Sequence, residues 1–351
     1  MQHSRNYKIL FAVLSFLLSP FQIFAQADSL NVTTDSLNLA MDTLTIDSVH
    51  TDSISSGKDT ISEVPAFDVM LPALAHSPLH GTSQGGAVYG DYYIVAISNN
   101  PRFNIYDLKE QTFICSIPVT EPTPDKTIHA NTICFGKTFY KQSDELPLLY
   151  VCSSYGDTIA DQSHLYVYRL TRPETSKFEA GLVQNITFGF RGWTECVIDC
   201  ANNDLWVKHY LSKSEIEYLK FSVPEFSEKE VTLSLSDAKE QIRTYEIPVN
   251  TQGFLYHDGH IYQVVGVPAK RETCYFVDFN LQTHDYERFT SLFELGMVNP
   301  ENNRDNKWEP ENIFVYQDEL YIGFHGFICR LNKERLYQEH NYKQLFERIY
   351  Q

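Results

Sequence analysis

The sequence predicts an all-β protein, a β-propeller of five blades with a short C-terminal helix. Five segments share one plan: a polar residue, a short apolar strand, a Gly/Asn/Asp turn and an aromatic-rich strand. Each copy continues into runs that alternate apolar and polar residues, which is the period of a β-strand. The copies begin about 45 to 65 residues apart, which suits a four-stranded propeller blade and is too irregular for a helical solenoid.

The first residues predict a secretory signal over 1–27. A basic start precedes the apolar run "ILFAVLSFLLSPFQIF", which ends in small residues at Ala25 and Ala27. Pro20 interrupts the run and no cysteine stands at the cleavage site, which disfavours a membrane or lipid anchor. We therefore expect an exported chain, periplasmic or at the cell surface, with no membrane insertion after signal removal.

Residues 28–64 predict a disordered acidic linker rich in Ser and Thr. They repeat an Asp-Ser/Thr-Leu/Ile theme and contain no aromatic residue, so they cannot bury enough apolar area to offset their ordering entropy. A glycosylated stalk or a calcium-binding repeat is the alternative, but neither the spacing nor a glycine turn fits a calcium loop. The propeller domain then spans 65–351.

The net charge limits the possible partners, and the cysteine pattern limits the possible disulfides. The formal net charge of −17, with no basic cluster, argues against nucleic acid or an anionic membrane as a partner. Seven cysteines lie mostly in strand-like runs and predict buried free thiols. Cys196 and Cys200, four apart in one strand, would lie roughly 13 Å from each other, too far for a disulfide. The sequence leaves the oligomeric state open.

The five copies follow one another along the chain. They are "TSQGGAVYGDYYIVAIS", "IHANTICFGKTFYKQSDELPLLYVCS", "WTECVIDCANNDLWVKH", "NTQGFLYHDGHIYQVV" and "EPENIFVYQDELYIGF". The second copy has an insertion before its second strand, and residues after it predict a rim loop that exposes Tyr155, Asp157 and Asp161. A sixth, degenerate blade over 214–235 is the alternative to five.

The ends of the repeat region predict how the ring closes. The last copy has few strands of its own after Phe327, and the segment 66–74, "AFDVMLPAL", offers a strand to complete it. Residues 333–350 have apolar side chains clustered toward one side and predict a C-terminal helix that packs on the ring.

The repeats also predict a functional site. The innermost strand of each blade lines the central channel, and strand side chains alternate with period two, so equivalent residues form layers at its mouth. The predicted ligand-binding residues of these two layers are Gln84, His129, Asn131, Trp193, Glu195, Gln252, Glu309 and Glu311. Thr82 and Asn250 complete the second layer.

We expect a non-catalytic binding module for carbohydrate or another small polar ligand, held by amides, carboxylates and stacking on Trp193. One alternative is that the ring only satisfies channel water and backbone groups. No cofactor is expected; Ca²⁺ is the alternative occupant, although His129 lies outside its oxygen preference.

Two other functions stay open. Glu195 and Glu311, on different blades, would form an inverting glycoside hydrolase pair if roughly 6.5 to 9.5 Å separated them across the channel. Propeller glycosidases, however, carry aspartates near the start of the first blades, where this chain has Gln84 and Asn131. A protein-interaction scaffold would instead expose an apolar patch on one ring face.

The motifs "HGTSQGGAVYGDYYIVA", "TQGFLYHDGHIYQVVGVP" and "EPENIFVYQDELYIGF" resemble those of exported bacterial proteins of the YVTN/WD-repeat-like propeller group. The resemblance covers about 65–331. It implies the propeller fold and supplies no catalytic residues. The copies lack the Trp-Asp dipeptide of WD repeats, so a close tie to intracellular scaffold propellers is not implied.

Overall fold

The computed structural model describes the strands of the repeat region and most of their connections. The described residues are 67–70, 83–97, 102–119, 130, 132–153, 163–174, 177–212, 215–245, 251–266, 274–292, 309–325 and 328–331. All of them belong to the second of two compact units, residues 62–351. The predicted signal, linker, rim-loop residues and C-terminal helix lie outside the described residues.

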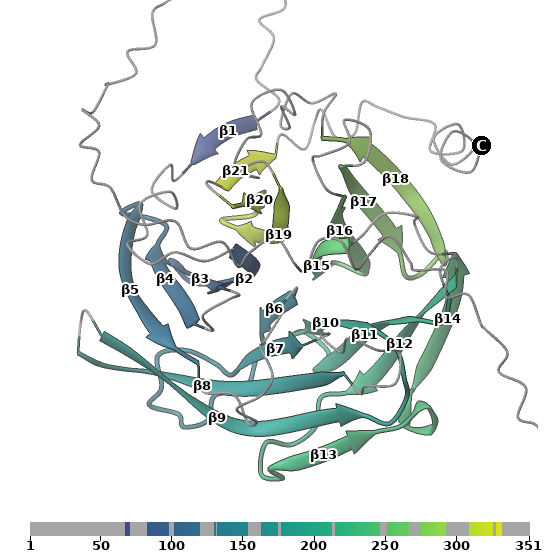
Figure 1. The fold of residues 1–351 in the computed structure, drawn as a ribbon, viewed down its shortest axis with the longest axis horizontal. Coiled ribbons are helices and arrows are strands. Elements are labelled where there is room, and N and C mark those ends of the chain that lie inside the picture. Colours follow the sequence, from purple (N-terminus) through teal and green to yellow (C-terminus); the bar gives the residue numbers. More distant parts are fainter. Residues whose placement is uncertain are drawn as a thin grey trace, which may run out of the picture. The chain divides into compact units, whose positions relative to one another are not determined.

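The described strands form five sheets arranged as the blades of a propeller, as the sequence predicts (Figure 1). Blade 1 contains β2 (Ser83–Tyr89), β3 (Tyr92–Ile97), β4 (Arg102–Asp107) and β5 (Thr112–Pro118). Blade 2 contains β6 (Thr132–Phe135), β7 (Leu149–Ser153), β8 (His164–Glu174), β9 (Lys177–Phe188) and β13 (Glu230–Leu233).

The other three blades have four strands each. Blade 3 contains β10 (Thr194–Asp199), β11 (Asp204–Tyr210), β12 (Glu215–Ser222) and β14 (Glu240–Tyr245). Blade 4 contains β15 (Thr251–His257), β16 (His260–Val265), β17 (Tyr275–Asn280) and β18 (Asp285–Ser291). Blade 5 contains β19 (Pro310–Tyr316), β20 (Glu319–Phe324), β21 (Ile328–Leu331) and β1 (Phe67–Met70).

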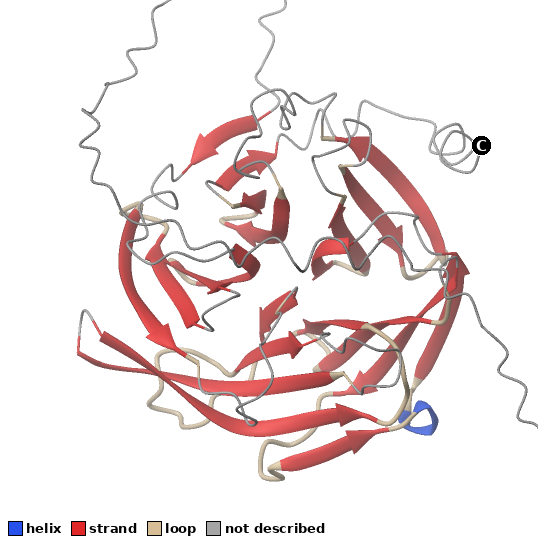
Figure 2. Cartoon of the chain, in the orientation of Figure 1, coloured by secondary structure: helices blue, strands red, loops and turns tan. Residues whose placement is uncertain are grey.

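Strands dominate the described part of the chain, whose helical structure is the single turn η3 (Leu235–Asp237) (Figure 2). No helix among the described residues is long and apolar enough to cross a membrane.

Two-residue turns join the first two strands of blades 1, 4 and 5. In blade 4, Asp258 and Gly259 have φ values of 48° and 80°, and in blade 5 Gln317 and Asp318 have 51° and 62°. Two consecutive residues with positive φ are typical of the type I′ turn, whose twist matches that of the flanking strands. The Gly/Asn/Asp turns of the repeats therefore set the hairpin registers.

The ring closes between β1 and β21, as the segment before the first repeat predicts. β1 pairs antiparallel with β21, with Phe67 opposite Leu331 and Met70 opposite Ile328. The last blade thus takes its outermost strand from the N-terminal side of the repeats. This pairing ties the first described residues to the last ones.

The alternative of a sixth blade over 214–235 is wrong. β12 is the third strand of blade 3, whereas β13 leaves that blade and pairs in parallel with β9 on the outer edge of blade 2. Glu230 lies opposite Asn185, and Leu233 opposite Phe188. The residues between β12 and β14 thus cross to the preceding blade. There β13 covers the edge of the sheet, which would otherwise be left unpaired.

The hydrophobic core consists of five clusters, each between two adjacent blades. Blades 5 and 1, for example, pack through Tyr93, Tyr106 and Phe314, which are almost fully buried. Because a blade packs on both of its faces, its strands are near-continuous apolar runs. Polar side chains that are buried in such a structure need hydrogen-bond partners. The partners of the buried polar side chains at the ring centre therefore indicate what those side chains do.

Candidate functional site

The first strands of the five blades, β2, β6, β10, β15 and β19, surround the centre of the ring (Figure 1). A hydrogen bond joins each of these strands, or its neighbour in the blade, to the next blade. In chain order these are Gly85 N to Ala130 O (2.7 Å), Cys196 N to Thr132 Oγ1 (3.2 Å), Lys208 Nζ to Thr251 Oγ1 (2.7 Å), Gln252 Nε2 to Glu309 Oε1 (2.8 Å) and Asn312 Nδ2 to Gln84 O (3.0 Å). The starts of the five first strands are thus tied together on one side of the ring centre, and this region is called the channel mouth below.

The predicted site residues differ in exposure. Gln84, Glu195 and Glu311 are buried, with 5%, 3% and 2% of their surface exposed. Gln252 and Glu309 are half-buried and hydrogen-bonded to each other across blades 4 and 5. Trp193 is 50% exposed. His129 and Asn131, together with Thr82 and Asn250, lie outside the described residues.

Three of the ring positions coincide with irregularities in the strand pairing. The register of the first hairpin shifts between Ser83 and Gly86 in blade 1, between Thr251 and Gly253 in blade 4, and between Pro310 and Asn312 in blade 5. The skipped residues include Gln84, Gln252 and Glu311. A bulge leaves a residue out of the ladder and changes the direction of its side chain. Simple alternation therefore does not describe these positions.

Asn312 fills a narrow slot next to Glu311. Its Nδ2 donates to the backbone oxygen of Gln84, and its Oδ1 accepts from the Tyr93 hydroxyl at 2.8 Å. The slot is lined by three glycines whose missing side chains leave the space for it: a Cβ there would lie within 2.2 to 2.8 Å of Asn312 atoms. They are Gly86, Gly253 and Gly323. Asn312 locks blade 5 against blades 1 and 4.

A buried lysine neutralises Glu195. Lys208, on β11, is fully buried, and its Nζ lies 3.9 Å from Glu195 Oε2. Lys208 also donates to Thr251 Oγ1 at 2.7 Å and to Gln263 Oε1 at 3.1 Å, which carries the network into blade 4. A buried charge is expensive without a partner, so Glu195 and Lys208 depend on each other within blade 3, while the bonds of Lys208 to Thr251 and Gln263 join blades 3 and 4. Sequence reasoning missed Lys208, which stands among strand residues with no motif of its own.

Glu309, Glu311 and His325 form a cluster of titratable side chains at the start of blade 5. Each offers one ligand atom within 4.8 Å of the other two. His325 Nε2 contacts Glu311 Oε1, and the Glu311 side chain is 3% exposed. Burial raises the pKa of Glu311 well above its ordinary range, and the nearby Glu309 raises it further. Burial also raises the pKa of Glu309, while His325 and the Gln252 amide oppose that rise.

Sequence reasoning missed His325, although the hairpin contains the signal. The turn at Gln317 and Asp318 fixes the register of β19 and β20, and Pro310 pairs with Phe324. One residue beyond this pair, away from the turn, Glu309 comes opposite His325. Counting residues along a two-residue hairpin would have found the histidine, provided the bulge at Glu311 was included.

Trp193 is held by the loop between blades 2 and 3. Its backbone oxygen accepts from Tyr210 N at 3.2 Å. Gly192, which precedes it, has φ of 114°, a conformation that favours glycine. His209 braces the loop by donating through Nε2 to the Arg191 oxygen at 2.6 Å, and its Nδ1 lies 2.8 Å from Glu217 Oε1. The backbone below the indole is thus fixed while the indole itself stays exposed.

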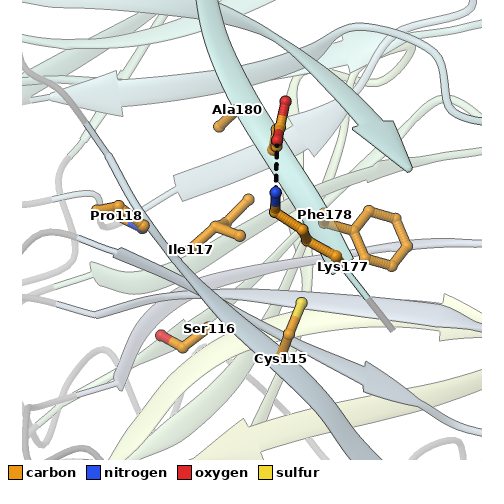
Figure 3. A pocket seen from close by; sticks show the side chains of 8 residues that line it. Cys115, Ser116, Ile117, Pro118, Lys177, Phe178 and Ala180 are labelled. Atoms are coloured by element: carbon orange, nitrogen blue, oxygen red, sulfur yellow. Dashed lines mark ion pairs between the residues drawn. The ribbon is translucent and has the colours of Figure 1, made fainter. Parts of the chain in front are cut away.

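A cavity of about 430 Å³ lies away from the channel, between the outer strands of blades 1 and 2 (Figure 3). Residues 115–118 of β5 and 177–180 of β9 line it. Lys177 and Glu179 form an ion pair of 3.1 Å there, and both side chains are more than half exposed. Exposed pairs of this kind contribute little to stability or specificity. The cavity offers no buried polar group comparable to those at the channel mouth.

Exposed large apolar side chains in the described part of the chain come from three blades. They are Tyr89, Tyr140, Trp193, Leu211, Leu235 and Tyr245. Tyr140 packs against Phe226 with the rings tilted at 45° and a ring-centroid distance of 5.3 Å, and it lies under Arg169. Scattered exposure of this kind is normal for a soluble domain surface.

No family model and no curated protein matches the chain. The resemblance to the YVTN/WD-repeat-like group therefore stays a prediction. Among solved structures, the chain is similar to AztD from Citrobacter koseri at 12% identity and a TM-score of 0.29, covering 60% of this chain and 47% of that one. The match thus spans about half the length of AztD.

Two other solved structures match more completely. The PQQ-bound aldose sugar dehydrogenase from Streptomyces coelicolor has 10% identity and a TM-score of 0.42, covering 76% of this chain and 99% of that one. The allergen Mala s 1 from Malassezia sympodialis has 12% identity and a TM-score of 0.38, covering 79% and 99%. Likenesses this distant carry no argument about function.

Proposed function

We propose that this chain is an exported, non-catalytic binding module that takes a small polar ligand, such as a carbohydrate, at the mouth of its channel. The observation that carries the proposal is the exposed indole of Trp193, which directly precedes β10, one of the five first strands whose starts bear polar side chains. Gln252 and Glu309 are half-buried there and remain partly accessible.

The chemistry suits a sugar. An indole offers an apolar face to the C–H face of a sugar ring, and amides and carboxylates bond its hydroxyls. Gln252 and Glu309, which are half-buried, offer an amide and a carboxylate of this kind. Because Gly192 and His209 fix the loop under Trp193, little ordering is required when a ligand stacks on the indole.

The environment of Glu195 favours binding over hydrolysis. An inverting hydrolase needs one carboxyl to protonate the leaving group and another to activate water. Glu195 instead lies beside the fully buried ammonium of Lys208, which also bonds two residues of blade 4. This pairing accounts for Glu195 as part of the inter-blade network.

The test is a thermal-shift screen of the full mature chain against a glycan panel, followed by calorimetric titration of any hit. Trp193→Ala is expected to lower affinity at least tenfold without changing the unfolding midpoint in the absence of ligand. Tyr245→Ala is the matched control, because Tyr245 is an exposed aromatic on the outer strand of blade 3, 63% exposed.

Equal affinity of the Trp193→Ala variant and the native chain would refute the assignment of the ligand to the channel mouth. The absence of any saturable shift across the panel would overturn carbohydrate as the ligand class. Release of reducing sugar from a bound glycan would overturn the non-catalytic part of the proposal and revive Glu195 and Glu311 as a hydrolase pair.

A further inference from the structure

Two carboxylates and an imidazole meet at the mouth of the channel, on blade 5. Glu309 precedes β19, Glu311 is the bulged residue of β19, and His325 follows β20. Their ligand atoms all lie within 4.8 Å of one another. The hairpin, with its two-residue turn, fixes all three positions on one rigid element.

The charge of the cluster is not balanced within it. Glu311 is almost fully buried, and a carboxylate oxygen of Glu309 lies within 4.8 Å of one of its own. A single imidazole can supply at most one positive charge to the two carboxylates. Buried carboxylates that share a site are normally protonated, paired or bound to a metal ion.

We infer that Glu309, Glu311 and His325 bind a divalent transition-metal ion, of which Zn²⁺ is the probe. Carboxylate oxygens and an imidazole nitrogen are ligands of Zn²⁺, Mn²⁺ and Fe²⁺, whereas Ca²⁺ prefers six to eight oxygens. The imidazole of His325 therefore favours a transition-metal ion over Ca²⁺. Three protein ligands leave at least one coordination position open toward the mouth.

Neighbouring residues complete the arrangement. Gln252 donates to Glu309 Oε1 at 2.8 Å, an outer contact of the kind that orients a ligating carboxylate. Asn312 fixes the backbone next to Glu311 by bonding to Gln84 O. Gln84, whose backbone oxygen accepts from Asn312, also has a buried side-chain Oε1 that lacks a hydrogen-bond partner among the described residues.

A second cluster, His260, Asp278 and Glu287 on blade 4, has similar composition. Its members are bonded in the same way as those of the first cluster: His260 Nδ1 lies 2.7 Å from Asp278 Oδ1, and Asn280 donates to Glu287 Oε1 at 2.5 Å. It also lies within one sheet, on three neighbouring strands, rather than at the channel mouth. It serves here as the matched control.

The inference goes beyond the proposed function, because a cation can occupy the cluster whether or not a sugar binds at Trp193. The experiment uses the full mature chain without an affinity tag, treated with EDTA and dialysed, and titrates it calorimetrically with Zn²⁺ and with Ca²⁺. One Zn²⁺ per chain is expected, bound more tightly than Ca²⁺. Glu311→Gln and His325→Gln are each expected to weaken Zn²⁺ binding by about 10- to 100-fold or more.

His260→Gln is expected to leave the affinity unchanged. A Co²⁺ titration adds a spectroscopic readout: visible absorption bands from the bound ion should be lost in His325→Gln. If Glu311→Gln fails to fold by circular dichroism, His325→Gln and the Co²⁺ bands still decide the question.

Unchanged Zn²⁺ affinity in His325→Gln, loss only in His260→Gln, or no saturable Zn²⁺ binding to the native chain would each overturn the inference. Tighter binding of Ca²⁺ than of Zn²⁺ would overturn the metal class. Trp193→Ala separates the two proposals: it should retain Zn²⁺ while losing the sugar, so either can fail without the other.

Discussion

The side-chain amide of Asn312, in the first strand of the last blade, donates to the backbone oxygen of Gln84, in the first strand of the first blade, at 3.0 Å. With Tyr93 donating to its Oδ1, both ends of this buried amide are engaged between blades. The bond links the two ends of the repeat array on the channel side. β1 and β21 link them on the outer side.

Asn312→Ala should therefore destabilise the propeller. It leaves the Tyr93 hydroxyl and the Gln84 carbonyl without their partner in a buried place, which costs about 2–4 kcal/mol in total. Denaturant unfolding followed by tryptophan fluorescence measures the change. Gln282→Ala, at an exposed turn position of blade 4, is the control and should change the free energy of unfolding by no more than about 0.5 kcal/mol. Equal stability of the two variants would contradict the locking role.

Removal of β1 should open the ring on its outer side. A chain that begins at residue 65 retains β1, whereas one that begins at residue 71 leaves the edge of β21 without its antiparallel partner. The shorter chain should unfold at a lower temperature and aggregate more readily, because an unpaired edge offers free backbone groups to other chains. Calorimetry and light scattering compare the two. Identical midpoints would show that closure through β1 is dispensable.

Lys208→Met should be more damaging than its conservative volume suggests. It leaves the Glu195 carboxylate buried without the ammonium that lies 3.9 Å away, a change that costs about 3–5 kcal/mol. Adding Glu195→Gln should recover part of the loss, because the second change removes the orphaned charge. The free energies of unfolding of the two single variants and the double variant form the required cycle.

The control is Lys220→Met in the same blade. Lys220 is 26% exposed and lies 3.5 Å from Asp204, which also pairs with Lys239. Its loss should cost at most about 1 kcal/mol. A Lys208→Met variant that was as stable as this control would argue that Glu195 is free for another role.

The repeats predicted the ring but not its details. Equivalent polar residues before apolar hairpins identified the starts of β10, β15 and β19, and the segment 66–74 supplied β1, because these features are local patterns. His325 was missed because the bulge at Glu311 changes which residues face each other. Lys208 was missed because its partner, Glu195, lies on the neighbouring strand β10. Such contacts depend on register across strands, which periodicity alone does not fix.

The crossing of β13 to blade 2 had no local signal at all. Four residues, Glu230–Leu233, pair in parallel with a strand more than 40 positions earlier in the chain. Their composition fits an outer strand of blade 3 or a degenerate extra blade equally well. The pairing with β9 distinguishes the outcomes, and Leu233 packs in the core between blades 2 and 3.

Acid should weaken the attachment of the connection between β6 and β7. Arg169 bonds both oxygens of Asp144, at 2.6 and 2.8 Å, and holds the pKa of Asp144 below its ordinary range. A carboxyl with a lowered pKa stabilises the fold above its unfolded-state pKa, near 4, and loses that contribution as the pH falls through the folded-state value. Asp144→Asn should therefore cost about 1 kcal/mol at neutral pH and progressively less below about pH 4.

Urea unfolding of both chains between neutral and acid pH measures that difference. Asp258→Asn, whose side chain is 89% exposed, is the control and should show a small difference at every pH. If Asp144→Asn lowered the free energy of unfolding by the same amount down to strongly acid pH, the ionised carboxylate would not be the form that Arg169 stabilises.

The backbone under Trp193 gives a prediction that tests its placement without touching the indole. Gly192 has φ of 114°, and a Cβ added there would lie 2.9 Å from the Tyr210 oxygen, so Gly192→Ala must shift the loop. Strain of this kind costs about 1–3 kcal/mol, and the shift should lower glycan affinity by moving the stacking surface. Gly90→Ala is the matched control: φ is 57°, but no atom lies within 4 Å of the added carbon. Gly90→Ala should lose some stability because of its positive φ, and it should keep the native affinity for glycan. Equal loss of affinity in both variants would mean that general destabilisation, and not the position of Trp193, controls binding.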